Sequence, residues 1–105
     1  KEMNNKHYIL KGKELIEADL MTWGKFFESP DRIVKQETLP NGLRVSTVFL
    51  GLDHNFGEGE PLLFESMVFG IDEEVQERYA TYDEAEAGHK KLVEEYSKTK
   101  AKKLR

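Results

Sequence analysis

The chain has 105 residues and no Cys, which excludes disulfides, thiolate metal sites and Cys nucleophiles. This length is typical of one domain, about 100–150 residues, and no apolar run approaches the roughly 18 residues of a membrane span. Five of the 16 Lys and Arg residues lie in residues 97–105, whereas all 20 Asp and Glu residues lie in residues 1–96. We therefore predict one acidic domain over residues 1–96 and a basic tail over residues 97–105. We expect no membrane association and no broad nucleic-acid binding by the acidic body.

The first part of the chain predicts two short strands, over residues 8–10 and 14–17, and then a helix over residues 19–28. Asp19 suits the N-cap of this helix because its carboxylate can accept a hydrogen bond from a free backbone N–H. Pro30 ends the helix, since proline disfavours helical geometry in the residue before it. Apolar side chains recur on one face of the helix at Leu20, Trp23, Phe26 and Phe27.

The middle of the chain predicts the main sheet. Strands over residues 32–39 and 43–52 flank Pro40-Asn41-Gly42, a hairpin turn in which Asn-Gly readily accepts positive φ. Further strands are predicted over residues 62–70 and 78–80. Short connections between successive strands favour an antiparallel meander of about four to six strands.

The predicted C-terminal helix starts after Thr81, which forms a capping box with Glu84. Its packing stripe consists of Ala85, Gly88, His89, Leu92, Val93 and Tyr96. On this stripe, His89 is expected to hydrogen-bond to the sheet backbone. The fold class is therefore α+β, with a short N-terminal helix and a C-terminal helix packed on the sheet.

Alternation along the two central strands assigns their side chains to two faces. The predicted core face carries Ser46, Val48, Leu50, Leu52, Leu62, Phe64, Ser66 and Val68. The second face carries Val45, Thr47, Phe49, Gly51, Leu63, Glu65, Met67 and Phe69. It is apolar enough to need a cover, from the first helix, a protein partner or a second copy of the chain. Glu65 on this face is expected to pair with an Arg or Lys.

An acidic, Gly-containing loop over residues 53–60 joins these strands. Residues that could bind Zn, Mn or Fe, or move a proton, at this end of the sheet are Asp53, His54, Glu65 and His89. Their spacing matches no H-x-x-x-H or H-E-x-x-H motif, and a partial calcium-loop pattern fails at Glu58 and Phe64. We therefore expect no metal and no other cofactor.

Three blocks of the sequence carry a resemblance to known proteins. They are DLMTW at residues 19–23, STVFLGLDHNFGEGEPLLFESMVFG at residues 46–70 and RYATYDEAEAGHKKLVE at residues 78–94. Together they are similar to a group of small proteins of unassigned activity that bacteriophages and prophages encode. The resemblance covers most of residues 8–94. It implies a phage or prophage setting and a cytoplasmic site of action, but no catalytic residue.

The leading hypothesis is an interaction protein that binds a host or phage protein through the second sheet face and the acidic loop. The predicted contacts are Phe49, Asp53, His54, Glu58, Glu60 and Met67. One alternative is a metal-dependent or acid–base enzyme that uses Asp53, His54, Glu65 and His89. Another is a nucleic-acid accessory protein that acts through the basic tail. The second face would also suit a homodimer.

Overall fold

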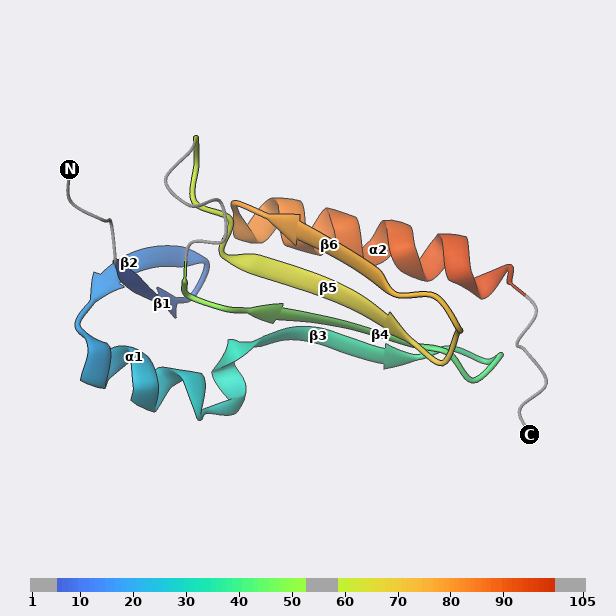
Figure 1. The fold of residues 1–105 in the computed structure, drawn as a ribbon, viewed down its shortest axis with the longest axis horizontal. Coiled ribbons are helices and arrows are strands. Elements are labelled where there is room, and N and C mark those ends of the chain that lie inside the picture. Colours follow the sequence, from blue (N-terminus) through green and yellow to red (C-terminus); the bar gives the residue numbers. More distant parts are fainter. Residues whose placement is uncertain (1–5, 53–58, 100–105) are drawn as a thin grey trace.

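The computed structural model describes residues 6–52 and 59–99. Its elements are β1 (His7–Lys11), β2 (Glu14–Ala18), α1 (Leu20–Phe27), the 3-10 helix η1 (Pro30–Arg32), β3 (Ile33–Thr38), β4 (Arg44–Phe49), β5 (Phe64–Phe69), β6 (Val75–Tyr79) and α2 (Tyr82–Ser97). The predicted α+β class is confirmed, with α2 packed on the antiparallel sheet (Figure 1). The strands form two sheets rather than one: the β1–β2 hairpin and a four-stranded sheet of order β3-β4-β5-β6. No helix in the described part of the chain is long and apolar enough to span a membrane.

The hairpin and α1 join one end of the four-stranded sheet. Asp19 caps α1 as predicted, because its Oδ1 accepts the Thr22 N–H at 2.8 Å. The indole N–H of Trp23 donates to the Leu50 carbonyl at 3.1 Å, just beyond the end of β4. Gly51 follows with φ of 77°, and a Cβ there would collide with the Trp23 indole and the Tyr8 carbonyl. Glycine at this position therefore allows α1 and β1 to approach the end of β4.

Both ends of α2 are fixed by side chains. The predicted capping box is confirmed at the start, where Thr81 Oγ1 accepts the Glu84 N–H at 3.1 Å and the Glu84 carboxylate accepts the Thr81 N–H at 3.3 Å. At the other end, the Asn41 amide donates to the carbonyls of Tyr96 and Thr99 at 2.8 and 2.7 Å. The β3–β4 turn therefore holds the last carbonyls of α2.

The strand register corrects the predicted faces. Three cross-strand pairs lie on the face that α2 covers: Val45–Val68, Thr47–Ser66 and Phe49–Phe64. Val48 pairs with Glu65 on the opposite face, so its predicted place in the core beside Phe64 is wrong. Alternation was correct within each strand, but the connection between β4 and β5 shifts their relative register. The sequence pattern does not determine the geometry of that connection.

The covered face holds two apolar clusters separated by polar side chains. The first cluster contains Leu10, Phe49, Leu63, Phe64 and Ala85. The second contains Leu39, Leu43, Val45, Val68 and Leu92. Thr47, Ser66 and His89 lie between the clusters along β4, β5 and α2, and we call these three residues the polar layer.

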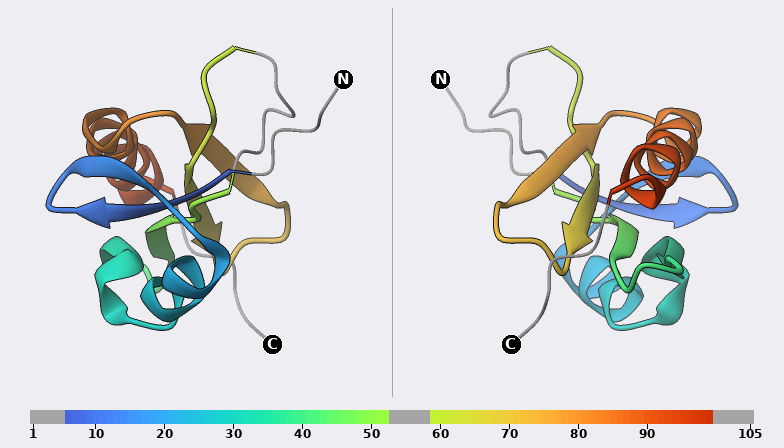
Figure 2. Two further views of the ribbon diagram at one scale, coloured as in Figure 1. Left: turned by 90° about the vertical axis from the view of Figure 1, so that its left-hand side faces the viewer. Right: turned by 90° about the vertical axis from the view of Figure 1, so that its right-hand side faces the viewer.

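The opposite face of the four-stranded sheet carries no described helix or strand. α2 and the hairpin lie on the same side of this sheet (Figure 2). α1 packs mainly against β1 and η1. Of the predicted second face it covers only the end near Phe49, where Phe26 meets the Phe49 ring edge to face with ring centroids 5.8 Å apart. The true register places Phe49 in the core, so this contact of α1 extends the core.

Candidate functional site

The uncovered sheet face is the first candidate site, and we call it the open face. By strand register it consists of Ile33, Gln36, Thr38, Arg44, Ser46, Val48, Glu65, Met67, Phe69, Gln76 and Arg78. Its apolar centre combines the half-buried Val48 and Met67 with Phe69, which is 41% exposed. An apolar centre on a sheet face without a described cover marks a surface suited to contact another molecule.

Two arginines give the open face its charge. The guanidinium of Arg44 lies 5.1 Å from the ring centroid of Phe69, within cation–π range. Arg78 Nε donates to Glu65 Oε2 at 3.3 Å, which confirms the expected pairing of Glu65 with a basic side chain. Among the described residues, Glu65 is the one carboxylate on this face, and no Lys belongs to it.

The polar layer beneath α2 is the second candidate. Thr47 and Ser66 are fully buried, and His89 is only 2% exposed. Thr47 Oγ1 lies 2.5 Å from Ser66 Oγ and 2.7 Å from His89 Nδ1, while His89 Nε2 lies 2.8 Å from Glu37 Oε1. The expectation of backbone partners for His89 is wrong, since both ring nitrogens meet side chains.

When His89 is neutral, the three hydrogen bonds that link Glu37, His89, Thr47 and Ser66 all run in one direction. The Glu37 carboxylate accepts the Nε2 hydrogen, which leaves Nδ1 to accept the hydroxyl hydrogen of Thr47. Thr47 in turn accepts from Ser66. The side-chain polar atoms of Thr47, Ser66 and His89 are then all paired, as burial of polar atoms requires.

Two grooves flank α2, one toward each edge of the sheet. The β3 groove has a volume of about 620 Å³ and is lined by residues that include Val34, Lys35, Glu37, His89, Lys90 and Val93. The β6 groove has a volume of about 410 Å³ and is lined by residues that include Glu77, Tyr79, Gly88, Lys91 and Glu95. Of the polar layer, His89 lines the β3 groove.

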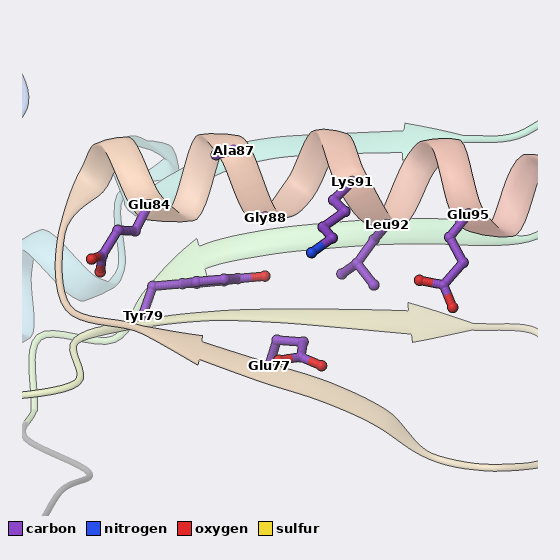
Figure 3. A pocket seen from close by; sticks show the side chains of 8 residues that line it. All are labelled: Glu77, Tyr79, Glu84, Ala87, Gly88, Lys91, Leu92 and Glu95. Atoms are coloured by element: carbon purple, nitrogen blue, oxygen red, sulfur yellow. The ribbon is translucent and has the colours of Figure 1, made fainter.

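Tyr79 forms the floor of the β6 groove. Figure 3 shows its ring lying under Gly88, with the hydroxyl pointing beneath the helix. A Cβ on residue 88 would collide with this ring, so glycine is required for the close approach. Among the described residues the buried Tyr79 hydroxyl has no hydrogen-bond partner. Burial raises the pKa of Tyr79, and the nearby Ser66 hydroxyl offsets part of that effect.

The predicted contact residues have different outcomes. Met67 lies on the open face, and Glu60 is exposed. Phe49 is fully buried between the rings of Phe26 and Phe64, so the prediction that it contacts a partner is wrong. Three further predicted contacts lie outside the described residues: Asp53, His54 and Glu58.

The predicted metal or acid–base set does not form one site. Glu65 lies on the open face with Arg78, whereas His89 lies under α2 on the covered face. The sheet therefore separates two of the four proposed members. Within residues 6–52 and 59–99, no group of three or more His, Asp or Glu side chains is placed to hold a metal ion.

Sequence reasoning missed Glu37 and Thr47 as partners of His89. The available signal was a histidine on an apolar helix stripe, together with hydroxyl side chains in the two central strands. A buried imidazole needs two polar partners, and Thr47 and Ser66 are the hydroxyl residues that the true register places side by side.

Comparisons with protein-family models, with curated proteins and with solved structures found no match. The residue composition of the surface is the remaining guide to which region binds a partner. Protein interfaces are enriched in aromatic residues, Met and Arg and are depleted in Lys, Glu and Asp. The open face has this composition at Arg44, Met67 and Phe69, in a chain with an excess of acidic residues.

Proposed function

We propose that this chain is a protein-interaction module that binds a partner protein through its open face. The observation that carries the proposal is the uncovered sheet surface with Val48, Met67 and Phe69 at its centre. Interfaces commonly combine such an apolar centre with a polar rim, and most of their binding energy comes from a few aromatic and Arg side chains.

The charges of the open face define the partner further. Arg44 stacks on Phe69 and has no carboxylate partner within the described residues. Its planar guanidinium is suited to bind a carboxylate through two hydrogen bonds. The partner surface is therefore apolar at its centre and acidic where it meets Arg44. The resemblance to phage and prophage proteins makes a host or phage protein the proposed partner class.

The acidic loop remains part of this proposal. Its predicted contacts are Asp53, His54, Glu58 and Glu60. Acidic groups that face a basic surface of a partner increase the association rate and add specificity. Replacement of the three loop carboxylates by amides is expected to slow association and to weaken its salt dependence.

Site-specific photo-cross-linking tests the open face. A benzoylphenylalanine at Met67 is expected to give one discrete protein adduct in bacterial host cells. The same probe at Glu94, which is exposed on α2, is the matched control and is expected to give none. Arg44→Glu and Phe69→Ser should each abolish the Met67 adduct and leave the far-UV spectrum unchanged. Equal adducts from both probe positions would contradict the proposal.

Light scattering distinguishes a second copy of the chain from a different partner. The purified chain is expected to remain a monomer as its concentration rises. A dimer that Phe69→Lys disrupts would instead make a second copy the occupant of the open face.

The nucleic-acid alternative depends on the basic tail. Ser97 ends α2, and residues 100–105 lie outside the described residues. This alternative predicts strongly salt-dependent binding that is lost when the chain is truncated after Thr99.

A further inference from the structure

The β3 groove contains the carboxylate of Glu37, which a buried side chain fixes through a hydrogen bond. Glu37 lies on the covered side of β3, and its Oε1 accepts the N–H of His89 Nε2 at 2.8 Å. His89 is in turn fixed by the buried hydroxyl of Thr47. Ordering a long side chain on an edge strand opposes folding through lost conformational entropy. Here the buried ring has already restricted the carboxylate, while the Glu37 side chain stays 37% exposed to the groove.

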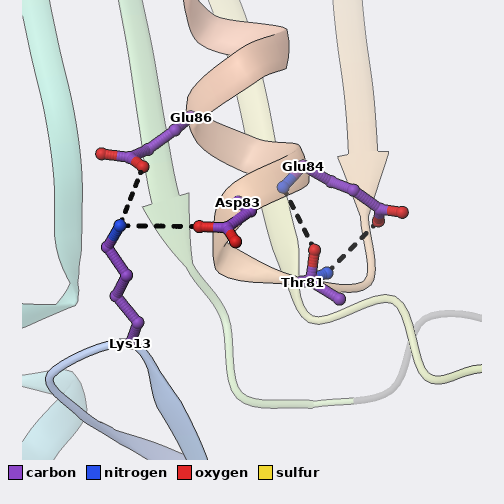
Figure 4. A network of polar contacts seen from close by, with 5 residues as sticks. All are labelled: Lys13, Thr81, Asp83, Glu84 and Glu86. Carbon is purple, nitrogen blue, oxygen red and sulfur yellow. Dashed lines mark hydrogen bonds and ion pairs between the residues drawn. The ribbon is translucent and has the colours of Figure 1, made fainter.

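Within the described part of the chain, Glu37 has no Lys or Arg partner at ion-pair distance. Lys13 reaches the same groove wall from the β1–β2 turn, but it pairs with Asp83 at 3.5 Å and Glu86 at 3.4 Å (Figure 4). A carboxylate offers about four acceptor positions, and the protein uses one of those on Glu37. An accessible, oriented anion therefore remains in the groove.

The walls around Glu37 are partly apolar. Val34 of β3 and Ala87 and Val93 of α2 line the groove, whose charged lining also includes Lys35, Asp83, Glu86 and Lys90. The groove volume of about 620 Å³ falls within the range of about 300–1,000 Å³ that is typical of small-molecule sites. Apolar walls beside an oriented anion match an aliphatic chain that ends in a cation.

We propose that the β3 groove binds a small alkylguanidinium or alkylammonium ion. The cation donates charge-assisted hydrogen bonds to Glu37, and its aliphatic chain packs between Val34 and Val93. His89 and Thr47 act as positioning residues that hold the carboxylate. This site lies on the opposite side of the sheet from the open face, so it is independent of the proposed protein interface.

An NMR titration of the isotope-labelled chain with butylguanidine tests this proposal. We expect saturable shifts in the amides of residues 34–37 and 86–93 and in the His89 ring signals. Butylurea has the same shape without the charge and is expected to cause no shifts. A blocked Gly-Arg-Gly peptide forms a second arm, because tighter binding of the peptide than of butylguanidine would identify an arginine side chain as the source of the cation.

Variants of two carboxylates on the same groove provide the matched comparison. Glu37→Gln is expected to weaken butylguanidine binding about tenfold or more, because a charge-assisted hydrogen bond is lost. Glu86→Gln, whose parent carboxylate is paired with Lys13, should change affinity less than about twofold. Thr47→Val should weaken binding while the charge of Glu37 is unchanged, which a purely structural role of the polar layer would not produce.

Three results would overturn the proposal. They are equal shifts with butylurea, unchanged affinity in Glu37→Gln, and shifts spread evenly over the acidic surface. The amide spectrum of Glu37→Gln away from the groove reports whether the variant is folded, so a folding failure is not mistaken for lost binding.

Discussion

His89 makes the most specific contact between α2 and the sheet. Its ring nitrogens meet Thr47 and Glu37, so α2 can neither rotate nor slide without leaving a buried polar atom unpaired. Apolar neighbours such as Leu92 define the contact less sharply, because apolar packing has no direction.

Thr47→Val tests the polar layer. Valine has nearly the shape of threonine, so the change removes the hydroxyl and leaves His89 Nδ1 and Ser66 without this partner. We expect the free energy of unfolding, measured by urea denaturation, to fall by about 1–3 kcal/mol. Thr38→Val, at an exposed position on β3, is the control and should change it by less than about 0.5 kcal/mol. Equal effects of the two variants would show that the layer does not stabilise the fold.

Tyr79→Phe is not expected to lower the free energy of unfolding, because it removes a buried hydroxyl that has no described partner. We expect stability near neutral pH to stay within about 0.5 kcal/mol of the parent or to increase. Burial raises the pKa of Tyr79 above its ordinary value of 10.0, so above that pH the unfolded chain loses this proton first. Stability should therefore fall as the pH rises above 10.0, and urea denaturation should show a smaller fall for Tyr79→Phe than for the parent.

At the scale of elements, the sequence predicts local structure well and relative register poorly. The α2 start, the α1 cap and the β3–β4 turn each depend on a few adjacent residues, namely Thr81 with Glu84, Asp19, and Asn41 with Gly42. The faces of β4 and β5 depend on residues 50–63, whose geometry alternation does not determine. This single unknown placed Phe49 on the wrong face and concealed Thr47 as a partner of His89.

Replacement of two helical glycines by alanine should change the free energy of unfolding in opposite directions. Gly88 in α2 lies against the Tyr79 ring, whereas no atom lies near the Cβ position of Gly24 in α1. Alanine is the better helix former by about 1 kcal/mol, so Gly24→Ala should raise the free energy of unfolding by up to that amount. Gly88→Ala should lower it by about 1–3 kcal/mol, because the added methyl group overpacks the contact. Stabilisation by both variants would show that α2 does not approach the β6 edge this closely.

At the scale of the whole molecule, the two faces of the four-stranded sheet have different roles. The covered face joins α1 and α2 through a line of aromatic rings, namely Phe26, Phe49, Phe64 and Tyr82. The hairpin adds Leu10 to the same apolar cluster. The open face adds no described element to this core. Substitutions at Met67 or Phe69 are therefore separable from stability, whereas substitutions of the aromatic line affect the whole molecule.

The aromatic line and Leu10 predict that the hairpin and α1 unfold together with the four-stranded sheet. Trp23 is the single Trp of the chain and reports on α1, while far-UV circular dichroism is dominated by the larger sheet and α2. The two signals should give one coincident transition in urea. Leu10→Ala should shift both midpoints together, since it opens a cavity in the first apolar cluster and lowers stability by about 2–5 kcal/mol. An earlier Trp23 transition would show instead that the hairpin and α1 form a separate folding unit, attached to the sheet mainly through Gly51.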